Sequence, residues 1–583
     1  MRMCMYRQLS LLFVLVASFN FTCFASSTPD SKAPAESSNV NGLSAISQQK
    51  QELAADERSL QSLGAFEISS TMLQLANANT KHKPVLNAGR GNPNWLNLQG
   101  RLAFNRMVEF GLQEARENID NGSMAGSINF AGIGSRFAAA MDASNETDLF
   151  LLQAVEYGHD SLGLDRDALV GELAQAALGD HYPVPSRCLP NTEKILNAYL
   201  ESVLYNNVSL KDETVLFPTE GGTAAICYIF NTLRHNDILK KGDKIAVCTP
   251  VFTPYLQIPR IRDYDLEEIK IETSSENGWN ISPAGLAKLA DPSIKACFLV
   301  NPANPSSHAL SAASLQGIKA AAEKNPALIL ITDDVYGTFV DDFQSLYSAA
   351  PHNTILVYSF SKLYGVTGWR LGLVAMHKDN VVDELLRSLP QKQKESLNKE
   401  YSIVTLEPEK LPFIERMCAD SRDIGLYHTS GLSTPQQAFM SLLALTHLVG
   451  EGDDAYIAAA NALIDNRYKK INAALGLQAD NEKNNAKYYM LLDTRKLAQN
   501  TYGAEFAEWF SKNYEEIDFL YKLAAEEGVV LMYGPGFDAP AGTLRVSLAN
   551  LSEDDYTEIG KRILELMAAY HADFLSAGQK QGA

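Results

Sequence analysis

Residues Ser359 to Arg370 read Ser-Phe-Ser-Lys-Leu-Tyr-Gly-Val-Thr-Gly-Trp-Arg, and they follow the β-branched and aromatic run Thr354-Ile-Leu-Val-Tyr358. The run predicts a strand, so Lys362 comes just after the strand's carboxyl end. A lysine amine in that position can form an imine with an aldehyde. The hydroxyls of Ser359 and Ser361 and the guanidinium of Arg370 can hold a phosphate beside it. Pyridoxal phosphate carries both groups, and we therefore predict a site for this cofactor.

Apolar, strand-like runs recur from about residue 212 onward, with helical segments between several of them. These runs are Thr214–Phe217, Lys244–Cys248, Ala296–Val300, Ala327–Thr332, Thr354–Tyr358 and Leu371–Ala375. Their alternation with helices predicts an α/β fold with a mostly parallel central sheet covered by helices on both faces. Residues 461–475 and 514–527 look helical, whereas 488–492 and 543–548 look like strands. The last part of the chain therefore predicts a smaller α+β domain.

The segment Glu220-Gly-Gly-Thr-Ala-Ala225 follows the first strand-like run and opens a helical stretch. Two adjacent glycines let backbone N–H groups approach an anion, and the N-terminus of a helix favours negative charge. Gly222 and Thr223 are therefore candidates for the same phosphate site. Taken alone, the segment is explained equally well as a plain strand-to-helix turn.

The segment Asp333-Asp-Val-Tyr336 follows the strand-like run that ends at Thr332. A carboxylate at that place can hydrogen-bond a pyridine nitrogen and keep it protonated, which makes the ring an electron sink. Tyr336 can donate to the phenolate oxygen of the same ring. For the motif in isolation, the simpler interpretation is an acidic turn.

Three further side chains follow or lie in predicted strands. Asn304, in Asn301-Pro-Ala-Asn-Pro305, offers an amide donor for the phenolate oxygen, although the segment can also be a tight turn. Phe252 can stack on the ring, although core packing is the commoner role of an isolated phenylalanine. Arg545 follows the loop Gly534-Pro-Gly536, and its planar fork matches a carboxylate; a surface ion pair is the alternative.

In this order, the motifs resemble those of the fold-type I pyridoxal-phosphate family, in its aspartate aminotransferase branch. The resemblance covers roughly residues 60 to 570 and includes Asn-Pro-x-Asn-Pro, Asp-x-x-Tyr, Ser-x-Ser-Lys and Gly-x-x-Arg-Val-Ser-Leu. It implies catalytic roles for Lys362, Asp333 and Tyr336, an α-carboxylate contact by Arg545, and a Tyr182 that reaches the phosphate of a neighbouring subunit. The other cofactor-binding residues that it implies are Gly222, Thr223, Phe252, Asn304, Ser359, Ser361 and Arg370.

In finer detail the chain is similar to aspartate 4-decarboxylases, which also transaminate. The segment Asn87-Ala-Gly-Arg-Gly-Asn-Pro-Asn-Trp95 resembles their signature and implies that Gly89 and Arg90 contact substrate. The stretches from Gly91 to Tyr182 and from about 380 to 430 resemble insertions that build larger oligomers. Whether Arg90 or Arg187 lies near the distal carboxylate of a substrate is left open by the sequence.

This resemblance implies conversion of L-aspartate to L-alanine and carbon dioxide through a ketimine, with accompanying aspartate aminotransferase activity. A plain class I/II aminotransferase, acting on aspartate or another amino acid, is the alternative. The implied partners are a small amino acid and a 2-oxo acid, together with further copies of the chain. We expect a homodimer at least, with a larger homo-oligomer as the extended form.

The N-terminus has the pattern of an export signal. Arg2 and Arg7 precede the apolar stretch Leu9–Val16, and Cys23-Phe-Ala25 matches a cleavage site. The apolar stretch is short for a membrane span, so we expect a periplasmic protein without stable membrane insertion after cleavage. An uncleaved anchor, or a cytoplasmic protein if the signal is not used, is the alternative. The expected organisation is a signal peptide (1–25), a linker and N-terminal segment (26–60), an N-terminal segment with the insertion (61–190), a large cofactor-binding domain (191–440), a small domain (441–575) and a tail (576–583).

Other classes of function fit the sequence less well. The formal net charge of −19 argues against a nucleic-acid partner. The cysteines that follow the leader show no metal-type spacing. Ser359-Phe-Ser-Lys362 matches the Ser-x-x-Lys motif of penicillin-binding enzymes, but no Lys-Thr-Gly follows and the serine does not open a helix. A non-catalytic regulator would be expected to add a basic DNA-binding helix, and none is found.

Overall fold

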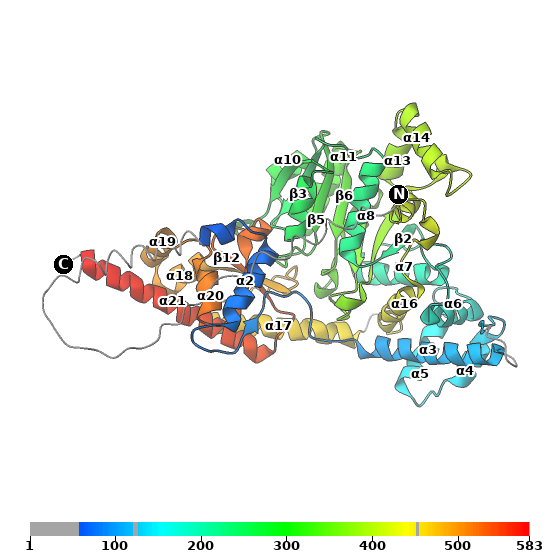
Figure 1. The fold of residues 1–583 in the computed structure, drawn as a ribbon, viewed down its shortest axis with the longest axis horizontal. Helices are drawn as coiled ribbons and strands as arrows, with labels where there is room; N and C mark the ends of the chain where they lie inside the picture. The colour runs from blue at the N-terminus through cyan, green and yellow to red at the C-terminus, as the bar shows by residue number, and fades with distance from the viewer. Residues whose placement is uncertain (1–56, 120–125, 451–453, 582–583) are drawn as a thin grey trace, which may run out of the picture. The chain divides into compact units, whose positions relative to one another are not determined.

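The computed structural model describes residues 57–119, 126–450 and 454–581, which belong to one compact unit (Figure 1). The expected signal peptide and most of the expected linker lie outside the described residues. Within the described part of the chain, none of the helices has both the length and the apolarity that crossing a bilayer requires.

The central sheet has seven strands. These are β2 (Thr214–Thr219), β3 (Lys244–Thr249), β4 (Glu267–Glu272), β5 (Ile294–Val300), β6 (Ile329–Asp333), β7 (Thr354–Ser359) and β8 (Gly372–His377). Their order across the sheet is β2-β8-β7-β6-β5-β3-β4. The strands from β7 to β4 are parallel, whereas β8 runs antiparallel to both of its neighbours. The predicted mostly parallel sheet is confirmed.

Helices cover both faces of this sheet, as β5 illustrates. Cys297 and Leu299 pack into one apolar cluster with Ile318 of α11 (Ala312–Lys324). Phe298, between them, points to the opposite face and packs against Phe230 of α8 (Gly222–His235), with ring centroids 6.2 Å apart. Because successive side chains of a strand alternate in direction, a strand buried on both faces must be apolar throughout. This explains the continuous apolar runs of the sequence.

Strand β4 was not predicted, because it reads Glu267-Glu-Ile-Lys-Ile-Glu272 and has four charged side chains. It pairs only with β3 and forms one edge of the sheet. Charged side chains on an edge strand discourage pairing with other chains, so an edge strand tolerates a composition that an interior strand does not.

The first insertion forms a helical bundle. Its helices are α3 (Leu98–Asn118), α4 (Ile133–Ala140), α5 (Glu146–Asp160) and α6 (Arg166–Leu178), which pack together beside α16 (Thr434–Leu448) (Figure 1). The second insertion forms α13 (Val381–Ser388), α14 (Gln391–Tyr401) and α15 (Phe413–Asp420). It has a small apolar cluster of its own that includes Leu397 and Tyr401.

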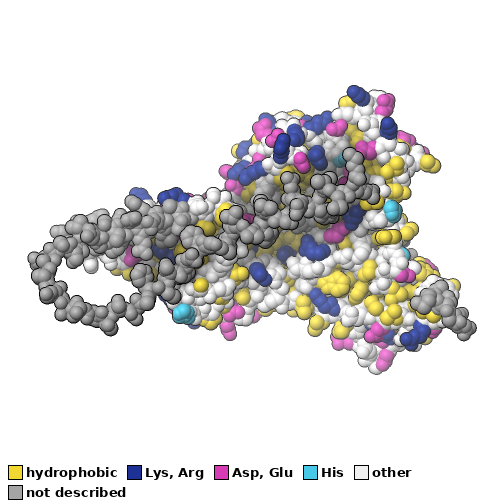
Figure 2. Space-filling model, in the orientation of Figure 1, with side chains coloured by type: hydrophobic (Ala, Val, Ile, Leu, Met, Phe, Trp, Pro, Cys, Tyr) yellow, Lys and Arg dark blue, Asp and Glu magenta, His cyan; other side chains and the backbone are white. Residues whose placement is uncertain are grey.

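Apolar side chains remain exposed on the first insertion and next to it. They include Leu98, Leu102 and Leu112 of α3, together with Tyr182 and Val184. Figure 2 shows hydrophobic side chains at the surface in the region where Figure 1 places these helices. Elsewhere on the described part of this face, Lys and Arg side chains are interspersed with Asp and Glu.

The C-terminal part contains a three-stranded antiparallel sheet with the order β11-β12-β9. Its strands are β9 (Tyr489–Asp493), β11 (Met532–Tyr533) and β12 (Thr543–Ser547). The helices of this part are α17 (Ala455–Leu475), α18 (Thr494–Tyr502), α19 (Ala504–Asn513), α20 (Asp518–Ala525) and α21 (Glu553–Gln581). The expected α+β composition is therefore present. The domain boundaries that the sequence suggested stay predictions.

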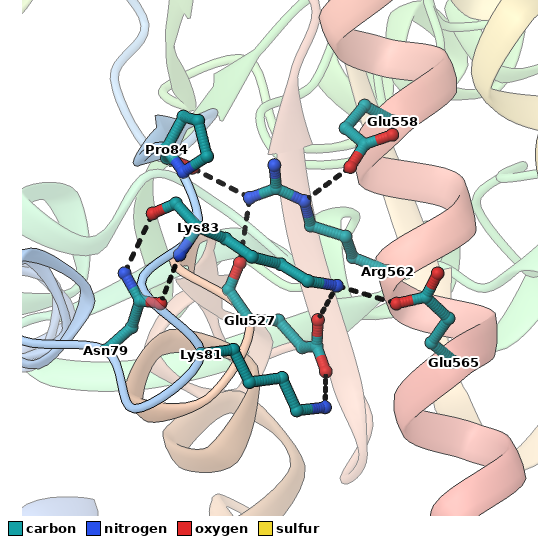
Figure 3. A network of polar contacts seen from close by, with 8 residues as sticks. All are labelled: Asn79, Lys81, Lys83, Pro84, Glu527, Glu558, Arg562 and Glu565. Atoms are coloured by element: carbon teal, nitrogen blue, oxygen red, sulfur yellow. Dashed lines mark hydrogen bonds and ion pairs between the residues drawn. The ribbon is translucent and has the colours of Figure 1, made fainter.

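The N-terminal segment joins this C-terminal part. The helix α2 (Ala65–Asn77) packs against α20, and β1 (Leu86–Asn87) pairs in parallel with β10 (Val529–Val530). A network of charged side chains holds the intervening chain (Figure 3). Lys81 and Lys83 both bind the carboxylate of Glu527, whose side chain is 0% exposed.

The same network extends into α21. Arg562 donates to the carbonyl oxygens of Pro84 and Glu527, at 2.7 and 2.8 Å. Lys83 also binds the exposed Glu565 at 2.7 Å. Burial acts to raise the pKa of Glu527, but the hydrogen bonds from Lys81 and Lys83 outweigh burial and hold that pKa below its ordinary value.

We expect Glu527→Gln to lower the free energy of unfolding by about 1 to 3 kcal/mol at neutral pH, because it leaves two lysines without their shared anion. A carboxyl whose pKa is depressed by folding stabilises the protein above its unfolded pKa and stops doing so as the pH falls. The difference should therefore shrink in acid, as measured by urea unfolding at several pH values. Glu565→Gln is the control: this side chain is 57% exposed, and its loss should cost under about 0.5 kcal/mol. Equal losses for the two variants would contradict the assignment.

Candidate active site

A cavity of about 450 Å³ lies at the carboxyl ends of the parallel strands. It brings together all but one of the residues that the sequence assigned to the cofactor or the substrate. These are Gly89, Arg90, Gly222, Thr223, Phe252, Asn304, Asp333, Tyr336, Ser359, Ser361, Lys362, Arg370 and Arg545. Tyr182 is the exception, because it is 64% exposed and lines a separate surface hollow beside α16.

The strand register explains why these residues meet. Val300 pairs with Asp333, and Asp333 pairs with Val357, so the neighbouring strands end at one edge. Ser359 and Thr219 both pair with Gly372, the first residue of β8. The segments that follow β2, β5, β6 and β7 are therefore neighbours, as expected for ligand sites in open parallel sheets.

Lys362 projects into the cavity. Its Nζ donates a hydrogen bond to the carbonyl oxygen of Gly91 at 3.2 Å, and it forms no ion pair with any carboxylate of the described residues. Burial is the main cause that lowers the pKa of Lys362; Arg545 acts in the same direction, whereas Tyr489 and Asp333 oppose it. A lysine with a lowered pKa has a larger neutral fraction, which is the form that attacks carbonyl groups and accepts protons.

Asp333 lies buried at the end of β6. Its carboxylate accepts hydrogen bonds from the hydroxyl of Tyr255 at 2.8 Å and from the backbone N–H of Val335 at 3.3 Å. Burial raises the pKa of Asp333 to about 6, while these two hydrogen bonds and the charge of Lys362 act in the lowering direction. A positively charged ring nitrogen facing this carboxylate would keep it ionised.

The predicted phosphate residues surround the N-terminus of α8. Gly221 caps this helix with φ 87°, and a Cβ atom there would lie 2.4 Å from Nη2 of Arg370. The guanidinium therefore approaches the backbone as closely as glycine permits. Ser359 Oγ lies 2.9 Å from Ser361 Oγ beside it. Free N–H groups, hydroxyls and a guanidinium together form a site for a phosphate dianion.

Arg545 approaches the cavity from β12. It is 2% exposed, and its guanidinium donates to Asn304 Oδ1 at 3.1 Å and to the carbonyl oxygen of Gly89 at 2.7 Å. Its Nε has no hydrogen-bond partner among the described residues, and no carboxylate there neutralises its charge. The alternative of a surface ion pair is wrong, because this side chain is buried. A buried cation held by neutral acceptors is suited to an incoming carboxylate.

The two arginines considered for a distal carboxylate lie in different places. Arg90 is exposed, lines the cavity and has no hydrogen-bond partner among the described residues. Arg187 does not line the cavity; it binds Glu193 and Glu415, each at 2.6 Å. Of these two arginines, Arg90 is therefore the one that the cavity of its own chain can use.

The loop that carries Arg90 is fastened to the segment after Lys362. Trp95 Nε1 donates to the carbonyl oxygen of Leu363 at 2.8 Å. The backbone N–H of Asn97 donates to the carbonyl oxygen of Tyr364 at 3.3 Å. Tyr488 donates to the carbonyl oxygen of Gly91, the acceptor that Lys362 also uses. The loop is thus a fixed wall of the cavity.

Two tyrosines of the site were missed in the sequence. Tyr255 lies three residues after Phe252 in the short helix α9 (Thr253–Gln257), and this spacing was the available signal. Tyr489 lies at the start of β9 and touches the site only because the three-stranded sheet packs there. Nothing in its local sequence separates it from Tyr488.

Comparisons with known proteins agree with this fold. The family model for class I and II aminotransferases matches residues 183–563. A bifunctional aspartate aminotransferase and L-aspartate beta-decarboxylase of Pseudomonas sp. is 41% identical over 91% of this chain and 100% of its own length. The structure of a double-mutant aspartate aminotransferase of Thermus thermophilus superposes with a TM-score of 0.55 at 18% identity, covering 87% of this chain and 98% of that one.

The chain therefore belongs to the class I and II aminotransferase family. Enzymes of this family depend on pyridoxal phosphate, and the described residues fit that cofactor. The cradle at α8 suits its phosphate, Lys362 suits its aldehyde, and Asp333 suits its ring nitrogen. No group of three or more His, Cys, Asp or Glu side chains in the described ranges is arranged to hold a metal ion.

We expect Asp333→Asn to stabilise the cofactor-free protein at neutral pH. A carboxyl whose pKa rises from 3.8 to about 6 on folding destabilises the native state as the pH rises through that interval. The variant should gain up to about 3 kcal/mol above pH 6 and nothing below pH 4, measured by urea unfolding of apoprotein. It should also bind pyridoxal phosphate more weakly. Asp341→Asn, at an exposed carboxylate that does not line the cavity, should leave both properties unchanged. An Asp333→Asn variant no more stable than wild type at pH 7 would contradict this account.

Proposed function

We propose that the protein converts L-aspartate to L-alanine and carbon dioxide with pyridoxal phosphate as cofactor, and that it also transaminates aspartate. The observation that carries this proposal is the 41% identity to a bifunctional aspartate aminotransferase and L-aspartate beta-decarboxylase, which extends over that enzyme's full length. The cavity supports it, because Arg545 and Arg90 both line it and offer a cation for each carboxylate of a dicarboxylic amino acid.

Arg545 is placed to hold the α-carboxylate of the substrate, and its unpartnered Nε remains available for that contact. Asn304 and Tyr336 line the same cavity and can donate to the phenolate oxygen of the cofactor. When bound, the cofactor supplies an electron sink for charge that develops on the substrate. Lys362 Nζ is placed to remove the proton from the substrate's α-carbon as general base and to return it later.

The distal carboxylate must be held without being strongly stabilised, since a tightly paired ground state opposes the loss of carbon dioxide. Arg90 suits this requirement, because it is exposed and therefore competes with water for the carboxylate. A buried bidentate arginine would favour transamination, in which the distal carboxylate stays intact. The exposed position of Arg90 thus supports the decarboxylase over the plain aminotransferase.

The deciding experiment is incubation of the purified holoenzyme with L-aspartate alone, with carbon dioxide and alanine measured over time. We expect many turnovers, because decarboxylation regenerates the cofactor without a 2-oxo acid. A single turnover that leaves the aminated cofactor would instead identify a plain aminotransferase. Lys362→Ala is the control and should yield neither product, since it removes the base and the covalent anchor together.

We further propose that the protein is exported after cleavage of residues 1–25 and assembles at least as a homodimer. The basic and apolar pattern of the leader supports export. The exposed Tyr182 supports assembly, because it lies outside the cavity of its own chain and is free to reach that of a second copy. The exposed leucines of α3 provide apolar surface that a second copy can cover.

Native mass spectrometry of protein purified from the periplasm of the producing cell tests both points in one measurement. We expect a subunit mass that corresponds to a chain beginning at Ser26 and an assembly mass of at least two subunits. A full-length subunit found only in the cytoplasm would contradict export. A stable monomer that retains full activity would contradict the shared site.

A further inference from the structure

Tyr489 lines the cavity, although it lies in none of the sequence motifs quoted above. It is 2% exposed, and its hydroxyl lies 2.8 Å from the hydroxyl of Tyr336. The face of its ring is 4.4 Å from the guanidinium carbon of Arg545. A Cβ atom at Gly91 would lie 2.4 Å from the Tyr489 hydroxyl, so the loop backbone closes over this group. Tyr489 therefore contacts Arg545 directly and also lies against Gly91, whose carbonyl oxygen accepts the hydrogen bond from Lys362.

The hydroxyls of Tyr336 and Tyr489 share one hydrogen bond, and only one of the two can donate it. Either oxygen can be the donor in the hydrogen bond between Tyr336 and Tyr489. A phenol has a single proton to donate, although its oxygen also accepts. If Tyr336 gives its proton to the phenolate oxygen of pyridoxal phosphate, it has only lone pairs left for Tyr489. The hydroxyl of Tyr489 must then be the donor of the pair.

We propose that Tyr489 is a positioning residue that directs the proton of Tyr336 toward the cofactor and strengthens that hydrogen bond. This inference rests on the proposed function, in which Tyr336 binds the phenolate oxygen. A hydroxyl that accepts a hydrogen bond becomes a better donor, because the two bonds polarise each other. The buried surroundings increase this effect, since both hydroxyls are shielded from water.

The ring and the hydroxyl of Tyr489 have separable tasks. The ring packs on Arg545 and lies edge-on to Tyr336, with centroids 5.4 Å apart. The hydroxyl makes no hydrogen bond to any described residue other than Tyr336. Tyr489→Phe therefore removes the donor and keeps the packing, which makes it a clean probe of the proposed task.

The test is a pH titration of the holoenzyme followed by its visible absorbance. The absorbance changes at the pH where the bond between Lys362 and the cofactor gains a proton. A weaker hydrogen bond to the phenolate oxygen favours the protonated form. We expect Tyr489→Phe to move this transition upward by about 0.5 to 1 pH unit, the effect of losing one hydrogen bond. The affinity of apoprotein for added pyridoxal phosphate should fall as well.

Tyr533→Phe is the matched control. Tyr533 lies on β11 of the same small sheet, is also buried, and donates to Glu516 at 3.2 Å, away from the cavity. This variant loses one hydroxyl without touching Tyr336, so its absorbance transition should stay at the wild-type pH. Thermal melting of both variants checks that each retains the fold.

A double-mutant cycle with Tyr336→Phe separates positioning from a direct effect. If Tyr489 acts through Tyr336, Tyr489→Phe should cause no further shift once the Tyr336 hydroxyl is gone. An equal shift in both backgrounds would overturn the proposal. So would a downward shift in the wild-type background, a shift below about 0.2 pH unit, or a folded variant that takes up no cofactor.

Failure of this inference and failure of the proposed function give different results. A wild-type protein that acquires no visible absorbance with pyridoxal phosphate, or that releases no carbon dioxide from aspartate, contradicts the function. A wild-type protein with both properties whose Tyr489→Phe variant titrates unchanged contradicts only the role of Tyr489.

Discussion

The separation of one amine from one carboxylate governs this site. Lys362 reaches a backbone carbonyl, that of Gly91, and not the carboxylate of Asp333. Asp333 is bound instead by Tyr255 and by the backbone N–H of Val335. A direct ion pair between the two would keep the amine protonated and would balance the charge of the carboxylate. Neither group would then be free for a cofactor. The parallel pairing of β6 with β7 holds both groups at one edge of the sheet, and their hydrogen bonds keep them apart.

The loop from Gly89 to Gly91 joins the two sheets through its carbonyl groups. The carbonyl of Gly89 accepts from Arg545, which comes from the three-stranded sheet, and that of Gly91 accepts from Lys362, which follows the seven-stranded sheet. On the N-terminal side of the loop, the chain is held by the network around Glu527 (Figure 3). On its C-terminal side, it is held by the hydrogen bond from Trp95 to Leu363. Because backbone carbonyls carry no net charge, they orient both cations without neutralising them. Arg545 therefore remains available to bind a carboxylate, and Lys362, whose pKa burial lowers, can lose its proton and attack an aldehyde as the neutral amine.

Much of this arrangement could be predicted, because strand ends in a parallel sheet meet at one edge whatever the lengths of the connections. Lys362, Asp333, Asn304 and the Gly222 segment each follow an apolar run, and the structure places them in one cavity. Strand β4 could not be found in this way, since its charged composition suits an edge position that only pairing with β3 defines. Tyr489 could not be found either, because its contact with Tyr336 joins residues 153 positions apart in the chain.

The sequence by itself determined the class of fold and the chemical groups at the strand ends, since periodicity and short motifs are local properties of a chain. Only the tertiary structure decided which cation is buried and which is exposed. Arg545 and Arg90 are both arginines beside glycine-containing loops, yet one is enclosed by Tyr489 and Phe537 and the other faces water. Burial depends on how separate elements pack, and packing sets the strength with which each arginine can hold a carboxylate. That difference, which no stretch of sequence contains, is the basis of our proposal that the cavity holds one carboxylate of a substrate firmly and the other loosely.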